Sequence, residues 1–158
     1  MIRKSIFLII LLAMSQFTLG QRIAIATKAM GAVEINKKAK PGYKSLKAGT
    51  ILEDGDGIRT GSDGFALLIF IDDKSQLKVK EDSETIISGK KIASAISKNV
   101  RIDNGTVRAQ VKKQRKGEFV IQSTTSVASV KGTDFWFIAN SEVGDMIIGL
   151  EGIVDLFN

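Results

Sequence analysis

The sequence predicts an all-β fold, formed by one domain of about eleven short strands. From Ile23 onward, apolar or alternating segments recur about every 8–12 residues, a spacing typical of sandwiches and barrels. Turn-forming residues separate these segments, and the chain contains 15 glycines but one proline. No long segment has a helical period, which disfavours parallel βαβ folds. The pattern is compatible with a sandwich-like fold, a barrel or a wrapped, solenoid-like β-fold.

The first clear strand signal is the segment "GAVEIN", residues 31–36. Its alternation places Val33 and Ile35 on one face, as in a half-buried strand. Pro41-Gly42 then predicts a turn. Between residues 46 and 64, short apolar pieces alternate with Gly and Asp, which predicts short strands joined by tight turns.

A hairpin is predicted between residues 65 and 79. The continuous apolar run 65–71 suggests a strand that is buried on both faces. Asp72-Asp73 begins a four-residue connection to the next strand, residues 76–79. The stretch from Lys90 to Ser97 fits one or two helical turns as well as it fits a strand edge.

The second half of the chain contains the strongest hairpin signal. Asn104-Gly105 lies between two alternating segments and is a dipeptide typical of two-residue hairpin turns. Further strands are predicted in residues 117–124, 127–139 and 142–157. Within the second of these, Gly132 predicts a bend, because glycine adopts backbone conformations that other residues resist.

Residues 1–20 have the pattern of a secretory signal peptide. Two basic residues precede the apolar run Ile6 to Met14, and position 20 is a glycine suited to cleavage. Nine residues fall short of the roughly 20 that span a bilayer. We therefore expect an exported protein, periplasmic or extracellular, with a domain of residues 21–158 and no stable membrane span. An uncleaved anchor is the alternative.

The residue types that are missing exclude several chemistries. The chain contains no cysteine, and therefore no disulfide and no lipid-carrying cysteine. It contains no histidine, which excludes Ser-His and Cys-His catalysis and histidine-ligated metals. Without residues 1–20, the chain has 21 basic and 17 acidic residues. This modest positive balance points to an acidic envelope protein or an anionic envelope polymer as partner.

Two basic clusters stand out. The first, around the Pro41-Gly42 turn, comprises Lys37, Lys38, Lys40, Lys44 and Lys47. The second, our candidate interaction patch, comprises Lys112, Lys113, Arg115 and Lys116. Clusters of this kind are usually solvated loop tips, and the functional alternative is docking of an acidic partner. Aromatic residues are not interleaved with either cluster, so we expect no nucleic-acid partner.

Acidic residues offer the candidates for a catalytic or metal site. Asp54, Asp56 and Asp63 could bind calcium, but glycines occupy the alternate positions where a calcium loop needs ligands, so a turn-forming role is preferred. The neighbouring glycines do not form a phosphate loop, because no Gly-Lys-Ser/Thr follows. An envelope lyase or hydrolase that uses carboxylates with a Lys or Tyr43 is the alternative function. We expect no enzyme activity, catalytic residue, metal or cofactor.

The order of the strand and turn motifs along the chain resembles that of the FecR domain family. The resemblance rests on "GAVEIN", "LKAGTILEDGDGIRTGSDGFALLIFIDDKSQLKV", "VRIDNGTVRAQV", "FVIQSTTSVASVKGTDFWF" and "LEGIVDLF", from Gly31 to Phe157. Two positions depart from the family pattern: Thr124-Thr125 stands where Thr-Pro is usual, and Lys131 replaces an Arg. Lysine keeps the charge but lacks the bidentate geometry of arginine.

The resemblance implies an all-β, extracytoplasmic module that acts by contact with other proteins. Relay of a signal to a cytoplasmic sigma factor, known for members with a cytoplasmic arm, is not expected here, because the signal segment leaves only Met1 to Lys4 inside. The expected role is a non-catalytic interaction, signalling or scaffold module of the cell envelope. Lys131-Gly132-Thr133, the family's corner motif, is then a structural corner.

Overall fold

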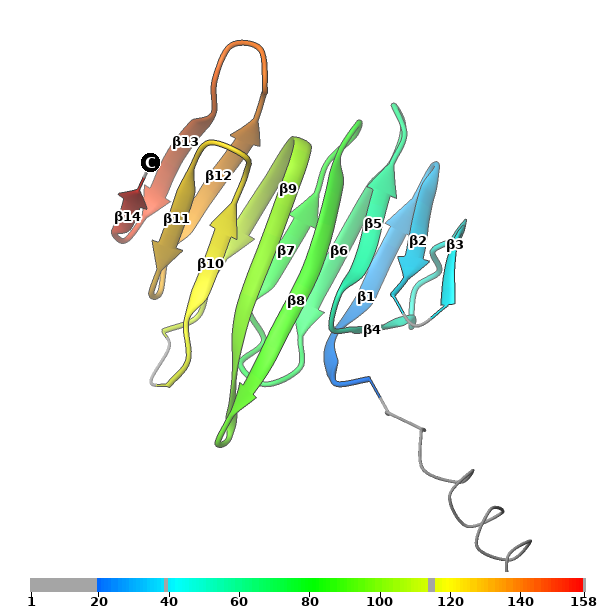
Figure 1. The fold of residues 1–158 in the computed structure, drawn as a ribbon, viewed down its shortest axis with the longest axis horizontal. Coiled ribbons are helices and arrows are strands. Elements are labelled where there is room, and N and C mark those ends of the chain that lie inside the picture. The colour runs from blue at the N-terminus through cyan, green and yellow to red at the C-terminus, as the bar shows by residue number, and fades with distance from the viewer. Residues whose placement is uncertain (1–19, 39, 114–115, 158) are drawn as a thin grey trace, which may run out of the picture.

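The computed structural model describes residues 20–38, 40–113 and 116–157. Its fourteen strands form one curled sheet, which folds over so that two layers face each other (Figure 1). In these residues no helix occurs, and so none is long and apolar enough to cross a membrane. The all-β, single-domain prediction is confirmed. The strand number exceeds the predicted eleven partly because residues 40–45, predicted to contain a turn at Pro41-Gly42, form an edge strand.

Both layers contain the long strand β9, and among the described residues each layer ends on both sides in a strand with one neighbour. In the first layer the order is β4 (Ile51–Glu53), β1 (Arg22–Met30), β6 (Phe65–Phe70), β7 (Gln76–Val79), β9 (Ala95–Gln110), β12 (Asp134–Ala139), β13 (Met146–Glu151). In the second layer it is β3 (Lys40–Ser45), β2 (Val33–Lys37), β5 (Asp56–Thr60), β8 (Glu84–Ile92), β9, β10 (Phe119–Gln122), β11 (Val127–Val130), β14 (Val154–Phe157).

Strand β9 joins the layers at Asn104-Gly105. Its first part pairs with β8 and β10, and residues 105–110 pair with β7 and β12. The prediction of a hairpin at Asn104-Gly105 is therefore wrong: the two flanking segments belong to different layers and do not pair with each other. Gly105 has φ +106°, and a Cβ there would overlap Ser83. The glycine is required by the crossing between layers.

Two other local predictions have clear outcomes. The hairpin across Asp72-Asp73 is confirmed, because β6 and β7 pair antiparallel. Strand β6 is not buried on both faces, however; its residues alternate between buried and partly exposed. The stretch from Lys90 to Ser97 forms the hairpin of β8 and β9 rather than a helix.

The core lies between the two layers. Along each central strand, alternate side chains point inward and are buried, as the strand period of two requires. Phe135 and Phe137 of β12 are completely buried. Phe70 of the first layer meets Phe119 of the second edge to face, with ring centroids 5.2 Å apart. Such a pair adds about 0.5–1.5 kcal/mol to the gain from burial, and it ties the layers together.

Candidate functional site

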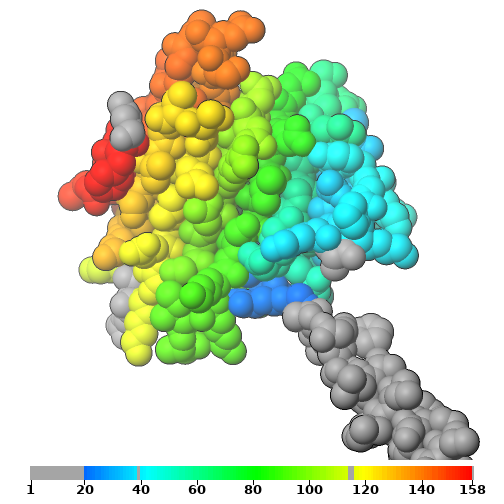
Figure 2. All heavy atoms as spheres, viewed as in Figure 1, coloured from blue at the N-terminus to red at the C-terminus, as the bar shows by residue number. Residues whose placement is uncertain are grey.

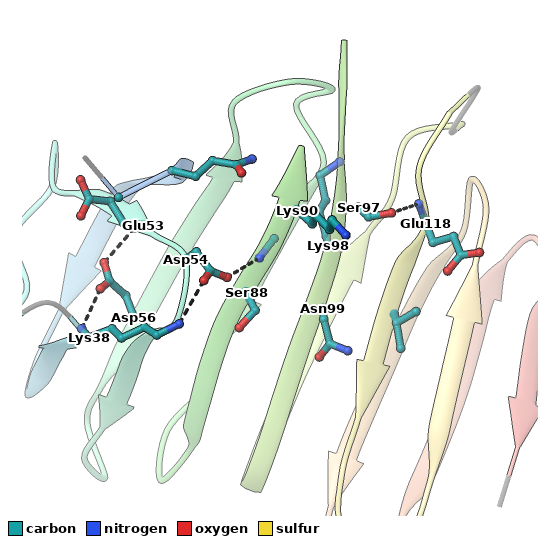
Figure 3. Close-up of a pocket in the computed structure, with 14 residues that line it drawn as sticks. Lys38, Glu53, Asp54, Asp56, Ser88, Lys90, Ser97, Lys98, Asn99 and Glu118 are labelled. Atoms are coloured by element: carbon teal, nitrogen blue, oxygen red, sulfur yellow. Dashed lines mark hydrogen bonds and ion pairs between the residues drawn. The ribbon is translucent and has the colours of Figure 1, made fainter. Parts of the chain in front are cut away.

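A cavity of about 870 Å³ lies beside β8 and β9 and extends to the start of the described chain (Figure 3). Its lining is charged and of both signs. The acidic residues are Glu53, Asp54, Asp56 and Glu118, and the basic residues are Lys38, Lys90 and Lys98. Carboxylates gathered in a concave site are what the enzymatic alternative requires, so the role of each one decides what the cavity can do.

Asp56 holds the turn between β4 and β5. Its side chain is almost completely buried and accepts hydrogen bonds from the backbone N–H groups of Glu53, at 2.8 Å, and Lys38, at 3.1 Å. It also accepts one from Lys37 Nζ at 2.6 Å. A carboxylate that receives two backbone N–H groups and an ammonium group stabilises its loop. Asp56 thus has a structural role.

Asp54 connects the same turn to β8. One of its oxygens accepts a hydrogen bond from the Gly89 backbone N–H at 3.1 Å, and the other pairs with Lys38 Nζ at 3.1 Å. Figure 3 places Glu53 and Glu118 on opposite sides of the cavity. Asp63 lies elsewhere and accepts a hydrogen bond from the Ala32 N–H. The turn-forming interpretation of these aspartates is confirmed, and among the described residues no group of three or more acidic side chains could hold a metal ion.

Lys98 is the one charged residue among the largest fully buried side chains, and it was not singled out from the sequence. It points into the core from β9, and its Nζ lies 2.8 Å from Asp72 Oδ2 and 2.7 Å from Asp73 Oδ2. The two aspartates belong to the β6–β7 turn of the opposite layer, so this ion pair fastens one layer to the other. Asp72 also accepts a hydrogen bond from the Ile96 N–H at 2.9 Å.

Tyr43, the tyrosine candidate for catalysis, is on the exposed edge strand β3. Its hydroxyl donates a hydrogen bond to Glu84 at 2.7 Å, and the Arg59 guanidinium lies 3.9 Å from its ring centroid. The hydrogen bond to Glu84 raises the pKa of Tyr43. A phenol that holds its proton more tightly is poorly suited to act as a base.

The candidate interaction patch and the corner motif are neighbours in space. Lys112, Lys113 and Lys116 are exposed in the connection between β9 and β10, whereas Arg115 lies outside the described residues. Lys131-Gly132-Thr133 carries the chain from β11 in the second layer to β12 in the first. A Cβ on Gly132, which has φ +72°, would lie 3.4 Å from the Cα of Lys113. The backbone N–H of Val111 donates a hydrogen bond to the Thr133 carbonyl at 2.8 Å.

Strands β13 and β14 form an apolar, open end, which was not identified from the sequence (Figure 1, left). Within the described chain, β13 pairs with β12 alone and β14 with β11 alone. Together with the turn between them, they expose Met146, Ile148, Leu150, Ile153, Leu156 and Phe157. The alternating apolar pattern predicts strands here, but it does not reveal that neither strand has a second neighbour in the described part of the chain.

The open end is also acidic. From Gly132 to Phe157 the chain contains no Lys or Arg, and its acidic residues are Asp134, Glu142, Asp145, Glu151 and Asp155. Two of them have partners: Arg108 pairs with Asp134 at 2.8 Å, and the hydroxyls of Ser123 and Thr125 donate to Asp145. The first basic cluster, around β3, lies at the opposite end of the molecule (Figure 2, cyan against orange and red).

The chain is similar to a known protein family. A family model described as FecR protein matches residues 56–154, which is more than half of the chain. The match runs from the start of β5 to the start of β14 and includes the corner motif and β13, while β3 precedes it. No curated protein and no solved structure matches the chain.

Proposed function

We propose, from the premise that this chain belongs to the FecR family, that it is a non-catalytic protein-interaction domain of the cell envelope. The observation that carries the proposal is the open end at β13 and β14. Exposed large apolar side chains on strands that pair on one side only are typical of sites of contact with other proteins. The family supports a signalling-related role, and a scaffold role is part of the proposal.

A role without catalysis is supported by the way the polar groups are used. The chain lacks histidine and cysteine. In the cavity, Asp54 and Asp56 hold turns, and Lys98 is bound by two aspartates.

An address in the envelope is part of the proposal. Its support is the signal-peptide pattern of residues 1–20, of which residues 1–19 lie outside the described residues. The expected mature protein begins at or near Gln21 and occurs in the periplasmic or extracellular fraction. Mass spectrometry of the exported protein tests this, and an intact Met1 would contradict it.

The proposed function is tested by covalent capture in intact cells. A photo-crosslinking amino acid at Ile148, in the open end, is expected to yield adducts with an envelope protein. The same amino acid at Tyr43, in the opposite edge strand, is the matched control and is expected to yield fewer adducts. Equal adducts from both positions, or none from either, would contradict the assignment of β13 and β14 as the contact surface.

A further inference from the structure

The amino group of Lys98 is enclosed by two carboxyl groups in the core. The Lys98 side chain is completely buried, and the centroid of the Phe70 ring lies 5.6 Å from Nζ. Nζ donates hydrogen bonds to Asp72 Oδ2 at 2.8 Å and Asp73 Oδ2 at 2.7 Å. A third goes to the carbonyl oxygen of Ile96 at 3.2 Å. Because Cγ of each aspartate is bonded to the oxygen that Nζ contacts, the nitrogen is held next to two carboxyl carbons, which is the proximity that favours a reaction between them.

One oxygen of Asp72 is buried without a hydrogen-bond partner. Its Oδ2 accepts hydrogen bonds from Lys98 Nζ and, at 2.9 Å, from the backbone N–H of Ile96. Its Oδ1 is buried and has no partner among the described protein groups. A buried polar atom without a partner costs free energy, and most such atoms in folded proteins are satisfied. An ion pair with Lys98 leaves this cost in place, whereas a reaction that removes Oδ1 would remove it.

Asp73 is positioned to carry a proton for such a reaction. Its Oδ1 accepts a hydrogen bond from the backbone N–H of Ser75 at 2.8 Å, which orients the side chain while Oδ2 contacts Lys98 Nζ. Proton transfer along the contact from Nζ to Oδ2 gives an uncharged amine. An uncharged amine is the form of lysine that attacks a carbonyl carbon. The site therefore contains a nucleophile, a carboxyl carbon and a separate group that exchanges the proton.

We propose that Lys98 and Asp72 condense in the folded protein to form an amide bond between their side chains, with Asp73 as the proton carrier. Nζ forms a bond to Cγ of Asp72, and the bond between Cγ and Oδ1 breaks. Of the three protons on the ammonium group, one stays on the amide nitrogen and two leave with Oδ1 as water, so the reaction needs no oxidant and no cofactor. The N–H of Ile96 donates to the oxygen that remains, and it stabilises the negative charge that develops there during the attack.

The amide bond would link the two layers covalently. Asp72 lies in the turn between β6 and β7 of the first layer, and Lys98 lies where β9 pairs with β8 and β10 in the second. The chain contains no cysteine, so a disulfide cannot make this link. In the product, the amide oxygen keeps the hydrogen bond from Ile96, and the amide N–H donates to Asp73. The reaction occurs once within the chain and requires no partner, so this inference is independent of the proposed function.

A second lysine–aspartate pair in the same chain is the matched control. Lys37 Nζ lies 2.6 Å from Asp56 Oδ2, but the Lys37 side chain is 32% exposed. Both oxygens of Asp56 accept hydrogen bonds from backbone N–H groups. Lys37 Nζ also donates to the carbonyl oxygen of Ile51, where Lys98 has a second carboxyl group. We expect this pair to remain an ion pair.

The test is mass spectrometry of the purified, folded chain, intact and after proteolysis. The intact mass is expected to be lower, by one water molecule, than the mass calculated from the N-terminus found by peptide sequencing. Proteolysis is expected to release a branched peptide that joins the segment containing Asp72 to the segment containing Lys98. Lys98→Arg, which keeps the positive charge, and Asp73→Asn, which removes the proton carrier, should each have the full calculated mass, whereas Lys37→Arg should still lack one water. Thermal unfolding checks that the variants fold, and the branched peptide from the wild type tests the proposal without them.

Three outcomes would count against the proposal. A folded wild type with the full calculated mass and no branched peptide would overturn the amide bond and leave an ion pair. Loss of water confined to a linear peptide that contains Asp72 would also overturn it, because that result indicates a cyclic imide between the aspartate and its own backbone. A branched peptide that persists in Asp73→Asn would overturn the role of Asp73 as the proton carrier.

Discussion

The edge strands at the two ends of the molecule have opposite compositions. At one end, β3 is fully exposed but contains Lys40, Pro41 and Lys44, residues that prevent another strand from pairing. At the other end, β13 and β14 contain apolar and acidic residues and no lysine or proline. The same chain thus blocks one edge against association and leaves the other available. Edge composition, rather than exposure alone, distinguishes an edge that resists pairing from one that allows it.

The difference extends to the side chains beneath the edges. Leu52 of the edge strand β4 is completely buried, whereas Leu156 of the edge strand β14 is 55% exposed. Both are leucines in edge strands, so they form a matched pair for measuring how tightly the side chains at each end are packed.

The largest expected effect is therefore the contrast between Leu52→Ala and Leu156→Ala. Leu52→Ala should lower the free energy of unfolding by about 2–5 kcal/mol, because it leaves a cavity in packed surroundings. Leu156→Ala should cost less than about 1 kcal/mol, because the side chain is already half in water. Urea denaturation measures both. Similar losses would mean that the open end is closed in solution and that the comparison fails.

A somewhat smaller effect is expected from Gly132→Val, about 1–3 kcal/mol. Gly132 has φ +72°, a conformation that a β-branched residue resists. It lies in the connection from β11 to β12. Thermal or urea unfolding measures the loss. A variant that unfolds together with the wild type would show that this corner relaxes without strain, and Gly105→Val, at the crossing of β9, is the positive control.

The ion pair between Arg108 and Asp134 should make the free energy of unfolding depend on pH, by roughly 1–2 kcal/mol. Hydrogen bonding by Arg108 holds the pKa of Asp134 below its usual value of 3.8, and a further hydrogen bond from Gln110 acts in the same direction. This stabilisation is present above about pH 4 and is lost as the pH falls through the lowered pKa. Asp134→Asn should therefore be less stable than the wild type at pH 6, and the difference should shrink toward pH 2. A difference that is constant with pH would contradict this account.

The smallest effect on stability is expected at the basic patch. Reversal of Lys112, Lys113, Arg115 and Lys116 to Glu should leave the melting temperature nearly unchanged, because exposed charges contribute little to stability. If the patch also contacts an acidic partner, the reversal should reduce pulldown of that partner at low salt. Equal recovery would assign the patch to solubility. A large fall in melting temperature would mean that the segment is packed.

Local patterns predicted the class of fold and some of its corners. The all-β class and the hairpin at Asp72-Asp73 depend on residues adjacent in sequence, and both are confirmed. Asn104-Gly105 misled because the same dipeptide that closes a hairpin also serves where one strand crosses between layers. Which of these occurs is decided by the strands that pair with each half of β9, and those lie far away in the sequence.

The features that matter for function were less accessible. Because lysine side chains are usually exposed, the sequence gives no reason to expect that Lys98 is buried. Its burial depends on Asp72 and Asp73, which lie about 25 residues earlier in the chain. The apolar alternation of residues 146–157 predicts strands with a buried face. It cannot indicate that, among the described strands, β13 pairs only with β12 and β14 only with β11, because that is a property of the whole sheet order.

Because β9 belongs to both layers, it limits how the domain can unfold. Each half of β9 has a hydrogen-bonded neighbour on both sides, so neither layer can come apart without disrupting the same strand. Amide protons in β9 should therefore exchange with solvent only when the whole domain unfolds. Those on the free edges of β13 and β14 should exchange through local fraying, orders of magnitude faster. A protein that contacts β13 would slow exchange there while leaving β9 unchanged.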